Sequence, residues 1–547
     1  MSVDQELEDL MSHLGEYGKY QRTQFILHSL GALTAGLHML TLVTIAPTPE
    51  HRCAVPDVEV NGTELAWNSS EVLSWIHRDE GGKYQSCLMF DSYTNKTSKC
   101  NSWVYDHTYY KSSRTMDWNM VCDRRWMLAV AQMMYMFGVF TGAVTLGTLA
   151  DKVGRKTIFY ISAVMQLVLG ILVAFVSEYY TFIVLEFMYG VFGSAGSYIT
   201  GFVLTMELVG PTKRTFCGII FQAVFAMGIM LVAVWGYFIR DRFYLQLIYG
   251  AHSLLLIGHW WLIDESPRWL WAQGRKLESI DIVDKAVKIN RKGNLVDRKE
   301  FIANQDIKAS AKSSEETSYG ILDLFRTRNL RTKSLNVCLS WFANSLGYYG
   351  LSLSTGKMSG DPFILLFIMA LVEMPSYTIV ILLLDKAGRR FILSSFMIMG
   401  GTALMCAAYV PEEGFFLSPY ILYIVFFGKF CIAGSFAVIY NYSAELFPTV
   451  LRNTGLGVGS MCARLSAALT PLIGLMDSFD KRIPMTIFAS ITLISGALGT
   501  LLPETVDKTM PQSLEDGEQF GIGDSCFTTG CFGRSKSKEK HIKLDDG

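Results

Sequence analysis

The sequence predicts an all-α membrane protein in which twelve transmembrane helices form two similar halves of six helices each. Half of the 547 residues are hydrophobic and only 18% are charged, which is less charge than a soluble chain of this length carries. Twelve apolar stretches are long enough to cross the core of a bilayer as helices. In addition, several polar motifs occur twice along the chain at an almost constant separation.

The repeated motifs indicate that one structural unit is present twice. A fixed separation between several motif pairs is the sequence signature of an internal repeat. Many membrane transporters are built from two similar apolar halves. The pairs are residues 151–156 (DKVGRK) with 385–390 (DKAGRR), Glu207 and Arg214 with Glu445 and Arg452, and residues 264–268 (DESPR) with 503–505 (PET).

The chain divides in order into five parts. They are a cytoplasmic N-terminus (1–22), an N-terminal six-helix half (23–263) that includes an extracellular loop (47–125), a cytoplasmic central segment (264–334), a C-terminal six-helix half (335–502) and a cytoplasmic tail (503–547). The twelve predicted spans are residues 23–46, 126–149, 157–176, 181–205, 215–239, 243–263, 335–354, 362–384, 391–410, 419–443, 454–476 and 483–502.

The segments outside the spans are polar. Residues 1–22 lack the basic start and short apolar core of a cleaved signal, so the first span is expected to stay as an anchor. The central segment is predicted to contain a helix near 275–292, followed by a Ser/Lys/Glu-rich linker. The tail is charged and contains Gly and Ser, which predicts a mobile segment.

The distribution of Lys and Arg predicts the orientation. The short loops at 151–156, 206–214, 385–390 and 445–453 are basic, whereas the loops on the other side of the membrane carry fewer basic residues. Basic loops stay in the cytoplasm, and an even number of spans then places both termini there as well. The long loop after the first span is expected to lie outside.

The content of this long loop agrees with an oxidising compartment. It contains Cys53, Cys87, Cys100 and Cys122, which are predicted to form two disulfides in one of three possible pairings. It also contains three N-glycosylation sequons, which begin at Asn61, Asn68 and Asn95.

Longer motifs carry a family resemblance that extends over nearly the whole chain. The loop motif from Gly147 to Lys156 resembles the signature of major facilitator transporters, although the second copy has Ile381 in place of the leading glycine. Together with the cysteine-rich loop, residues 264–270 (DESPRWL) and 444–453 (AELFPTVLRN) resemble the organic cation, carnitine and organic anion transporter family. Among its branches, the carnitine and organic cation branch is the most similar in motifs. The resemblance implies the major facilitator fold.

The repeated loop motifs are predicted to gate the transporter. An aspartate at a helix end followed by basic residues can lock neighbouring helices through contacts that break when the halves rock. The predicted gating residues are Gly147, Asp151, Gly154, Arg155, Glu207, Arg214, Asp385, Gly388, Arg389, Glu445 and Arg452.

Ionisable residues inside spans are costly and are therefore candidates for function. The C-terminal half has Glu373, Lys429 and Arg464 near the middle of spans, and we expect Glu373 to pair with Lys429. Arg464 can hold a carboxylate in bidentate fashion. In the resembling family, anion and carnitine members place an arginine here, whereas cation-selective members place an aspartate. For Glu186 and His38 in the N-terminal half, we expect a structural or gating role.

Aromatic residues complete the predicted substrate site. A quaternary ammonium group binds to the faces of aromatic rings. The candidates for this role are Tyr348, Tyr377, Tyr440, Tyr442 and Trp341.

These features predict a plasma-membrane transporter of small organic cations or zwitterions of carnitine type, working by alternating access. An organic anion exchanger, favoured by Arg464 and Lys429 but opposed by Glu373, is one alternative, and a non-transporting receptor or sensor is another. An enzyme is not expected, because no nucleophile–base pair or metal cluster occurs at usable spacing. We therefore expect no catalytic residue, no metal and no cofactor, and the coupling ion, sodium or proton, stays open. The expected partners are the substrate and the lipid bilayer, with no nucleic acid and no obligate protein partner.

Overall fold

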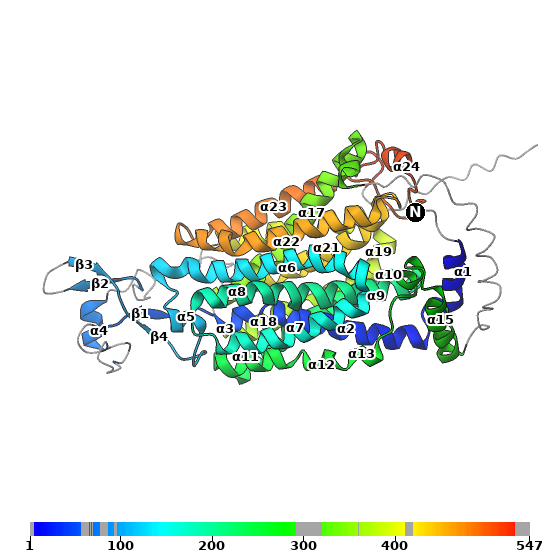
Figure 1. Ribbon diagram of the computed structural model, residues 1–547. Coiled ribbons are helices and arrows are strands. Elements are labelled where there is room, and N and C mark those ends of the chain that lie inside the picture. Colours follow the sequence, from blue (N-terminus) through cyan, green and yellow to red (C-terminus); the bar gives the residue numbers. More distant parts are fainter. Residues whose placement is uncertain are drawn as a thin grey trace, which may run out of the picture.

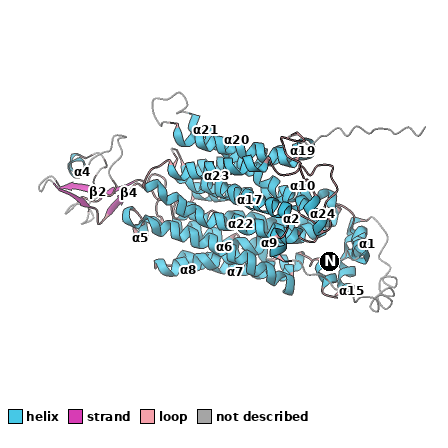
Figure 2. Cartoon of the chain, turned by 90° about the horizontal axis from the view of Figure 1, so that it is seen from above, coloured by secondary structure: helices cyan, strands magenta, loops and turns pink. Residues whose placement is uncertain are grey.

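The computed structural model describes residues 5–55, 59, 65, 67, 69–76, 86–91, 96–291, 320–358, 360–410 and 420–530. Long helices run side by side through the molecule (Figure 1). Short strands lie at one end of the helices, which we call the loop end. The helices α1 (Gln5–Leu14), α15 (Lys276–Asn290) and α24 (Leu514–Gln519) lie at the opposite end, which we call the tail end (Figure 2).

The helices of the two halves follow the predicted spans. The N-terminal half contains α2 (Lys19–Met39), α3 (Thr41–Ile45), α6 (Arg125–Val153), α7 (Arg155–Phe175), α8 (Tyr179–Gly190), the π-helical turn η2 (Val191–Gly196), α9 (Ser197–Leu208), α10 (Pro211–Phe238), α11 (Arg242–Ala251), α12 (Leu254–Ile257) and α13 (His259–Leu262). The C-terminal half contains α17 (Arg328–Ser354), η4 (Thr355–Lys357), α18 (Pro362–Leu371), α19 (Glu373–Ala387), α20 (Arg389–Tyr409), α21 (Ile421–Leu446), α22 (Arg452–Gly474), η6 (Leu475–Ser478) and α23 (Ile483–Gly499).

Within the described ranges, nine helices are long and apolar enough to cross a membrane, and each coincides with a predicted span. The other three predicted spans fall on α11–α13, α17 and α23. The first of these is interrupted between short helices, and α23 has 17 residues. By contrast, α17 is long but carries polar side chains, including Lys333 and Asn344, along its length.

Glycines allow the closest helix contacts. A Cβ atom on Gly36 of α2 would lie 2.0 Å from the Phe225 carbonyl oxygen of α10, and one on Gly228 of α10 would lie 2.1 Å from the Leu33 carbonyl oxygen of α2. Each helix therefore presents a glycine to the backbone of the other. Small residues at such crossings let helices in a membrane approach closely, because lipid provides no hydrophobic force between them.

The long loop after the first span forms a small folded unit at the loop end. Strand β1 (His51–Cys53) pairs with β4 (Trp103–Tyr105), and β2 (Leu88–Asp91) pairs with β3 (Lys96–Lys99), both antiparallel. Short helices α4 (Ser70–Trp75) and α5 (Arg114–Trp118) and the turn η1 (Cys122–Arg124) complete it. The two predicted disulfides are present, and the pairing is Cys53–Cys100 and Cys87–Cys122. The glycosylation candidates Asn61, Asn68 and Asn95 lie outside the described residues.

At the tail end, α1 and α15 lie over the N-terminal half (Figure 1), and α14 (Pro267–Ala272) packs against α15 and α9. Leu10 and Leu14 of α1 form a buried cluster with Trp271 and Val283. Charged contacts at the edge of this cluster include the ion pair of Arg268 with Glu8, 2.7 Å long.

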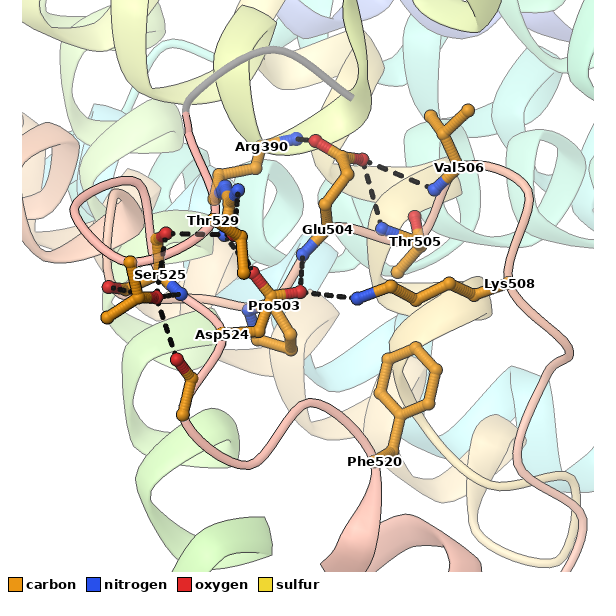
Figure 3. A network of polar contacts seen from close by, with 12 residues as sticks. Arg390, Pro503, Glu504, Thr505, Val506, Lys508, Phe520, Asp524, Ser525 and Thr529 are labelled. Atoms are coloured by element: carbon orange, nitrogen blue, oxygen red, sulfur yellow. Dashed lines mark hydrogen bonds and ion pairs between the residues drawn. The ribbon is translucent and has the colours of Figure 1, made fainter. Parts of the chain in front are cut away.

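The C-terminal half is covered by its own tail, so the prediction of a mobile tail is wrong for residues 503–530. The carboxylate of Glu518 accepts hydrogen bonds from the backbone N–H groups of Asn329 and Leu330, both at 2.9 Å, and so caps the start of α17. Asp524 forms ion pairs with Arg390, at 2.8 Å, and with Lys508 (Figure 3). The turn η3 (Ile321–Phe325) precedes α17 on the same side. These charged groups find partners far away in the sequence.

Candidate functional site

A cavity of 80 Å³ lies between the two halves. The N-terminal half contributes uncharged side chains, and the C-terminal half contributes tyrosines and one arginine. The lining residues are Met39, Met136, Val139, Tyr198, Gln222 and Phe225 from the N-terminal half, and Ser345, Tyr348, Tyr349, Tyr377, Phe436, Tyr440, Ser460, Ala463, Arg464 and Ala467 from the C-terminal half. We call this the central cavity.

Arg464 is the one charged residue among those that line this cavity. Its Nη1 donates a hydrogen bond to the Ser460 carbonyl oxygen at 3.1 Å and another to the Ser460 hydroxyl, one helical turn earlier on α22. Among the described residues, no carboxylate forms an ion pair with Arg464. Its guanidinium therefore keeps donor groups for a further acceptor.

Glu373 and Lys429 form the predicted ion pair. The distance from Lys429 Nζ to Glu373 Oε1 is 3.1 Å, and the two side chains are 1% and 0% exposed. Lys429 Nζ also donates to the Ser352 hydroxyl at 2.8 Å and lies 3.2 Å from the centre of the Tyr348 ring. Neither charged residue lines the central cavity. The two charges compensate each other behind the cavity wall.

Two tyrosines connect this ion pair to the cavity. The hydroxyl groups of Tyr348 and Tyr377 both donate hydrogen bonds to Glu373 Oε2, at 3.1 and 2.8 Å. Both residues also line the central cavity. Glu373 therefore fixes the orientation of two aromatic rings at the cavity surface.

The remaining aromatic candidates lie at different distances from the central cavity. Tyr440 lines the cavity, and Trp341 lies behind it with 4.3 Å between the ring centres. Trp341 Nε1 donates to the Ser443 hydroxyl at 3.0 Å, so Trp341 supports Tyr440 and does not line the cavity. The assignment of Tyr442 to the substrate site is wrong. This residue is fully buried, and its hydroxyl donates to the Pro503 carbonyl oxygen at 2.5 Å, toward the tail.

Sequence reasoning missed several lining residues. Tyr198, Gln222 and Phe225 of the N-terminal half are uncharged, so a search for ionisable residues in spans does not find them. Glu186 and His38, the two ionisable candidates of that half, are buried elsewhere and do not line the cavity. Within the C-terminal half, Tyr349 and Phe436 were also not predicted, although both lie close in sequence to predicted residues.

The predicted gating motifs form two equivalent networks at the tail end. In the first, Arg155 Nη2 lies 2.9 Å from Asp151 and 3.4 Å from Glu207. The second consists of Arg389 with Asp385 and Glu445, each 3.0 Å away. Each arginine joins the connection between two helices to the last turn of a third helix, α9 or α21, of the same half.

A glutamate after each half completes these networks. Glu265 accepts hydrogen bonds from the backbone N–H groups at the start of α7, and Glu504 accepts them at the start of α20. Gly154 and Gly388 immediately precede these helices with φ angles of 112° and 96°. A Cβ atom there would lie 2.5 Å from Glu265 and 2.4 Å from Glu504. In each half, the glutamate can therefore take this position only because the residue before the helix is a glycine.

Three other predicted gating residues lie outside these contacts. Arg214 donates to the Val209 carbonyl oxygen and Arg452 to the Thr449 hydroxyl, both at 3.3 Å. An added Cβ at Gly147 would meet nothing within 4 Å. This agrees with the presence of Ile381 at the corresponding position of the second half.

Comparison with known proteins identifies the family. The profile of the sugar (and other) transporter family matches residues 85–513. An organic cation transporter protein of Drosophila melanogaster is 36% identical over 528 residues, which cover 94% of this chain and 95% of the relative. The human organic cation/carnitine transporter 2 is 31% identical over 531 residues, 93% of each chain. The chain belongs to the organic cation and carnitine transporter family. It is therefore a multi-pass membrane transporter and not an enzyme.

Solved structures show the fold of this organic cation and carnitine transporter family member. The xylose transporter XylE from E. coli, in an inward open conformation, has a TM-score of 0.59 at 17% identity and covers 90% of this chain and 98% of XylE. XylE bound to 6-bromo-6-deoxy-D-glucose gives a TM-score of 0.60. The predicted fold class, an all-α membrane protein with the major facilitator fold, is confirmed.

Proposed function

We propose that this transporter moves small organic cations and zwitterions of carnitine type by alternating access through the central cavity. The observation that carries the proposal is the arrangement of charge around this cavity. Arg464 faces it without a carboxylate partner among the described residues, whereas Glu373 is neutralised by Lys429 behind its wall. A substrate carboxylate would supply the missing partner.

The guanidinium of Arg464 would hold this carboxylate. Its fixed fork of N–H donors matches the two oxygens of a carboxylate, and a charge-assisted pair of this kind is strong when water is excluded. The two hydrogen bonds to Ser460 hold the side chain in place and use only Nη1. The other terminal nitrogen is left for the substrate.

The tyrosines would hold the ammonium group of the same substrate. Tyr348, Tyr377 and Tyr440 line the cavity together with Tyr349 and Phe436. Ring faces attract a quaternary ammonium, which cannot donate hydrogen bonds. Because Glu373 binds the hydroxyls of Tyr348 and Tyr377, these two rings are already oriented before substrate arrives.

The relatives support a cationic or zwitterionic substrate over the organic anion alternative, since those compared above are named organic cation and organic cation/carnitine transporters. The same names oppose a non-transporting receptor. Residues 47–125 would face the outside of the plasma membrane and both termini the cytoplasm. The basic loops at the tail end and the two disulfides at the loop end support this orientation. Asn61, Asn68 and Asn95 would then be accessible to glycosylation.

The test compares uptake of radiolabelled carnitine and tetraethylammonium by cells that express the wild type, Arg464→Ala or Arg464→Lys. We expect carnitine uptake at low concentration to fall roughly tenfold or more in Arg464→Ala, because a charged hydrogen-bond partner is lost. Tetraethylammonium, which has no carboxylate, should be spared. Arg464→Lys should recover part of the carnitine uptake, since lysine offers a point charge without the fork.

Arg326→Ala serves as the matched control, because this arginine is 69% exposed at the tail end. Its uptake of both compounds should equal that of the wild type at equal surface amounts. Uptake of tetraethylammonium alone, indifferent to Arg464, would show a simple cation carrier and would refute the zwitterion site. Uptake of neither compound would refute the proposed substrate class.

A further inference from the structure

A second cavity, of 940 Å³, opens between the two halves at the loop end. We call it the outer cavity. It lies directly beyond the central cavity, because the same three helices line both. Along α6 the lining passes from Gln132 in the outer cavity to Met136 in the central one, and along α22 it passes from Thr470 to Ala467. On α17 the adjacent residues Gly350 and Tyr349 belong to the outer and the central cavity. A substrate that enters from the loop end therefore has to move between α6, α17 and α22.

One ion pair crosses this route. Arg125, the first residue of α6, places Nη2 at 2.8 Å from Asp477 Oδ1 and 3.1 Å from Oδ2. Asp477 lies in η6, directly after α22, and both residues line the outer cavity. The carboxylate is 14% exposed and the guanidinium 40% exposed. The same nitrogen, Nη2, therefore contacts both carboxylate oxygens.

This pair differs from all other ion pairs that join described residues, because it alone connects the N-terminal half to the C-terminal half. The networks of Arg155 and Arg389 at the tail end stay within their own halves. Aromatic contacts do cross the interface nearer the tail end, such as Phe202 with Tyr440 at 6.2 Å between ring centres. A rocking motion of two rigid halves would have to separate Arg125 from Asp477.

We propose that the ion pair of Arg125 and Asp477 is the outer gate of this transporter, and that it breaks whenever the central cavity opens toward the outer cavity. The proposal rests on the orientation given above, in which the loop end faces outward, but not on the identity of the substrate. The strength of the pair suits a gate. Partly exposed ion pairs contribute little to stability, so thermal motion or a substrate can break this contact. Once separated, both charged groups face the outer cavity.

The test measures how fast a membrane-impermeant, positively charged thiosulfonate reagent reaches the central cavity from outside intact cells. Ala467→Cys places a reporter thiol there, and labelling of the parent protein without this cysteine is subtracted. We expect Arg125→Ala and Asp477→Asn each to increase the labelling rate roughly two- to fivefold, because the closed state loses the attraction between the two charges. The charge swap Arg125→Asp with Asp477→Arg should return the rate toward that of the reporter protein.

The matched control is the ion pair of Lys99 with Asp123, which lies on the loop unit with side chains 73% and 78% exposed. Asp123→Asn should leave the labelling rate at Ala467→Cys unchanged. A separate reporter, Asp123→Cys, measures the amount of protein at the cell surface and corrects for poorly folded variants.

Two results would overturn the proposal. If Arg125→Ala and Asp477→Asn leave the labelling rate at that of the Ala467→Cys reporter protein while Asp123→Cys labels normally, the pair does not control access. If the charge swap labels as fast as the single variants, the effect of the single substitutions does not come from a lost ion pair. Absence of labelling at Asp123→Cys in intact cells that still take up substrate would show that the loop end faces inward, which would overturn the outer position of the gate without bearing on the substrate.

Discussion

Glu373 and Lys429 meet inside the C-terminal half with 3.1 Å between Oε1 and Nζ, and neither side chain is more than 1% exposed. A charge in such a place is tolerated only because the opposite charge is beside it. The pair also holds two cavity tyrosines through Glu373. Removing one member should therefore disturb both stability and the substrate site.

We expect Lys429→Ala and Glu373→Ala each to lower the free energy of unfolding by about 3–5 kcal/mol, because each leaves a buried charge alone. The double variant should be destabilised by clearly less than the sum of the two. Thermal unfolding of the purified protein in detergent measures this coupling. Removing the exposed pair of Lys99 and Asp123 should change stability by less than about 1 kcal/mol. Additive effects at Glu373 and Lys429 would contradict the role of the pair.

Gly388→Ala should lower stability by about 1–3 kcal/mol, because alanine is strained at a φ of 96° and its Cβ would lie 2.4 Å from Glu504. Gly154→Ala should behave in the same way beside Glu265. Gly147→Ala is the control from the same motif, since a Cβ there meets nothing within 4 Å. It should be neutral or slightly stabilising in a helix. The unfolding temperature and the amount of protein at the cell surface are the measurements, and equal effects at Gly147 and Gly388 would refute the steric argument.

Tyr440 and Tyr442 should respond differently to substitution. Tyr440→Leu removes a ring from the central cavity and should raise the KM for tetraethylammonium by roughly two- to thirtyfold, the range of one cation–π contact. Tyr442→Phe loses only the hydrogen bond to Pro503 and should cost about 1 kcal/mol of stability with an unchanged KM. Uptake kinetics and thermal unfolding of both variants separate the two roles. A raised KM in Tyr442→Phe would place this residue back in the substrate site.

The tail contact of Asp524 should be insensitive to pH in the physiological range. Burial opposes ionisation of Asp524, but hydrogen bonds from Lys508, Thr529 and Arg390 outweigh it and lower its pKa from 3.8 to about 2. Because the pKa is lower in the folded protein, the stabilisation is complete above about pH 5 and is lost as the pH falls from about 4 to 2. The difference in unfolding temperature between wild type and Asp524→Asn should stay constant from pH 8 to pH 5 and decrease by pH 3. A difference that vanishes already at pH 6 would contradict the assignment.

The fold was predictable because the bilayer sets a length that every span must reach, and the chain shows twelve runs of that length. Arg464, Glu373 and Lys429 were predictable for a related reason, since charge inside a span stands out against apolar neighbours. Tyr198 and Gln222 carry no such contrast, and only the packing of the two halves shows that they face the cavity. The placement of Tyr442 was an avoidable error, because residues two apart on a helix point in nearly opposite directions.

The contacts of the tail with the C-terminal half were not predictable from the sequence for a different reason. Its composition is polar and charged, which is typical of segments that cannot bury enough apolar surface to fold alone. Residues 503–530 are ordered by partners that lie more than a hundred residues away, such as Arg390 for Asp524 and the start of α17 for Glu518. Local composition contains no information about such contacts.

Each half is covered at the tail end by a segment of its own, and this has a consequence for how the molecule could be produced. All side-chain hydrogen bonds that join described residues stay within one half, except those of Arg125 to Asp477. A polypeptide severed between Arg291 and Gly320 would leave each fragment with its own helices, its own loop network and its own covering segment. Two independently synthesised fragments would then reassemble in the bilayer through helix packing such as that of α6 with α22. By this reasoning, the continuity of the chain is dispensable for the assembled carrier.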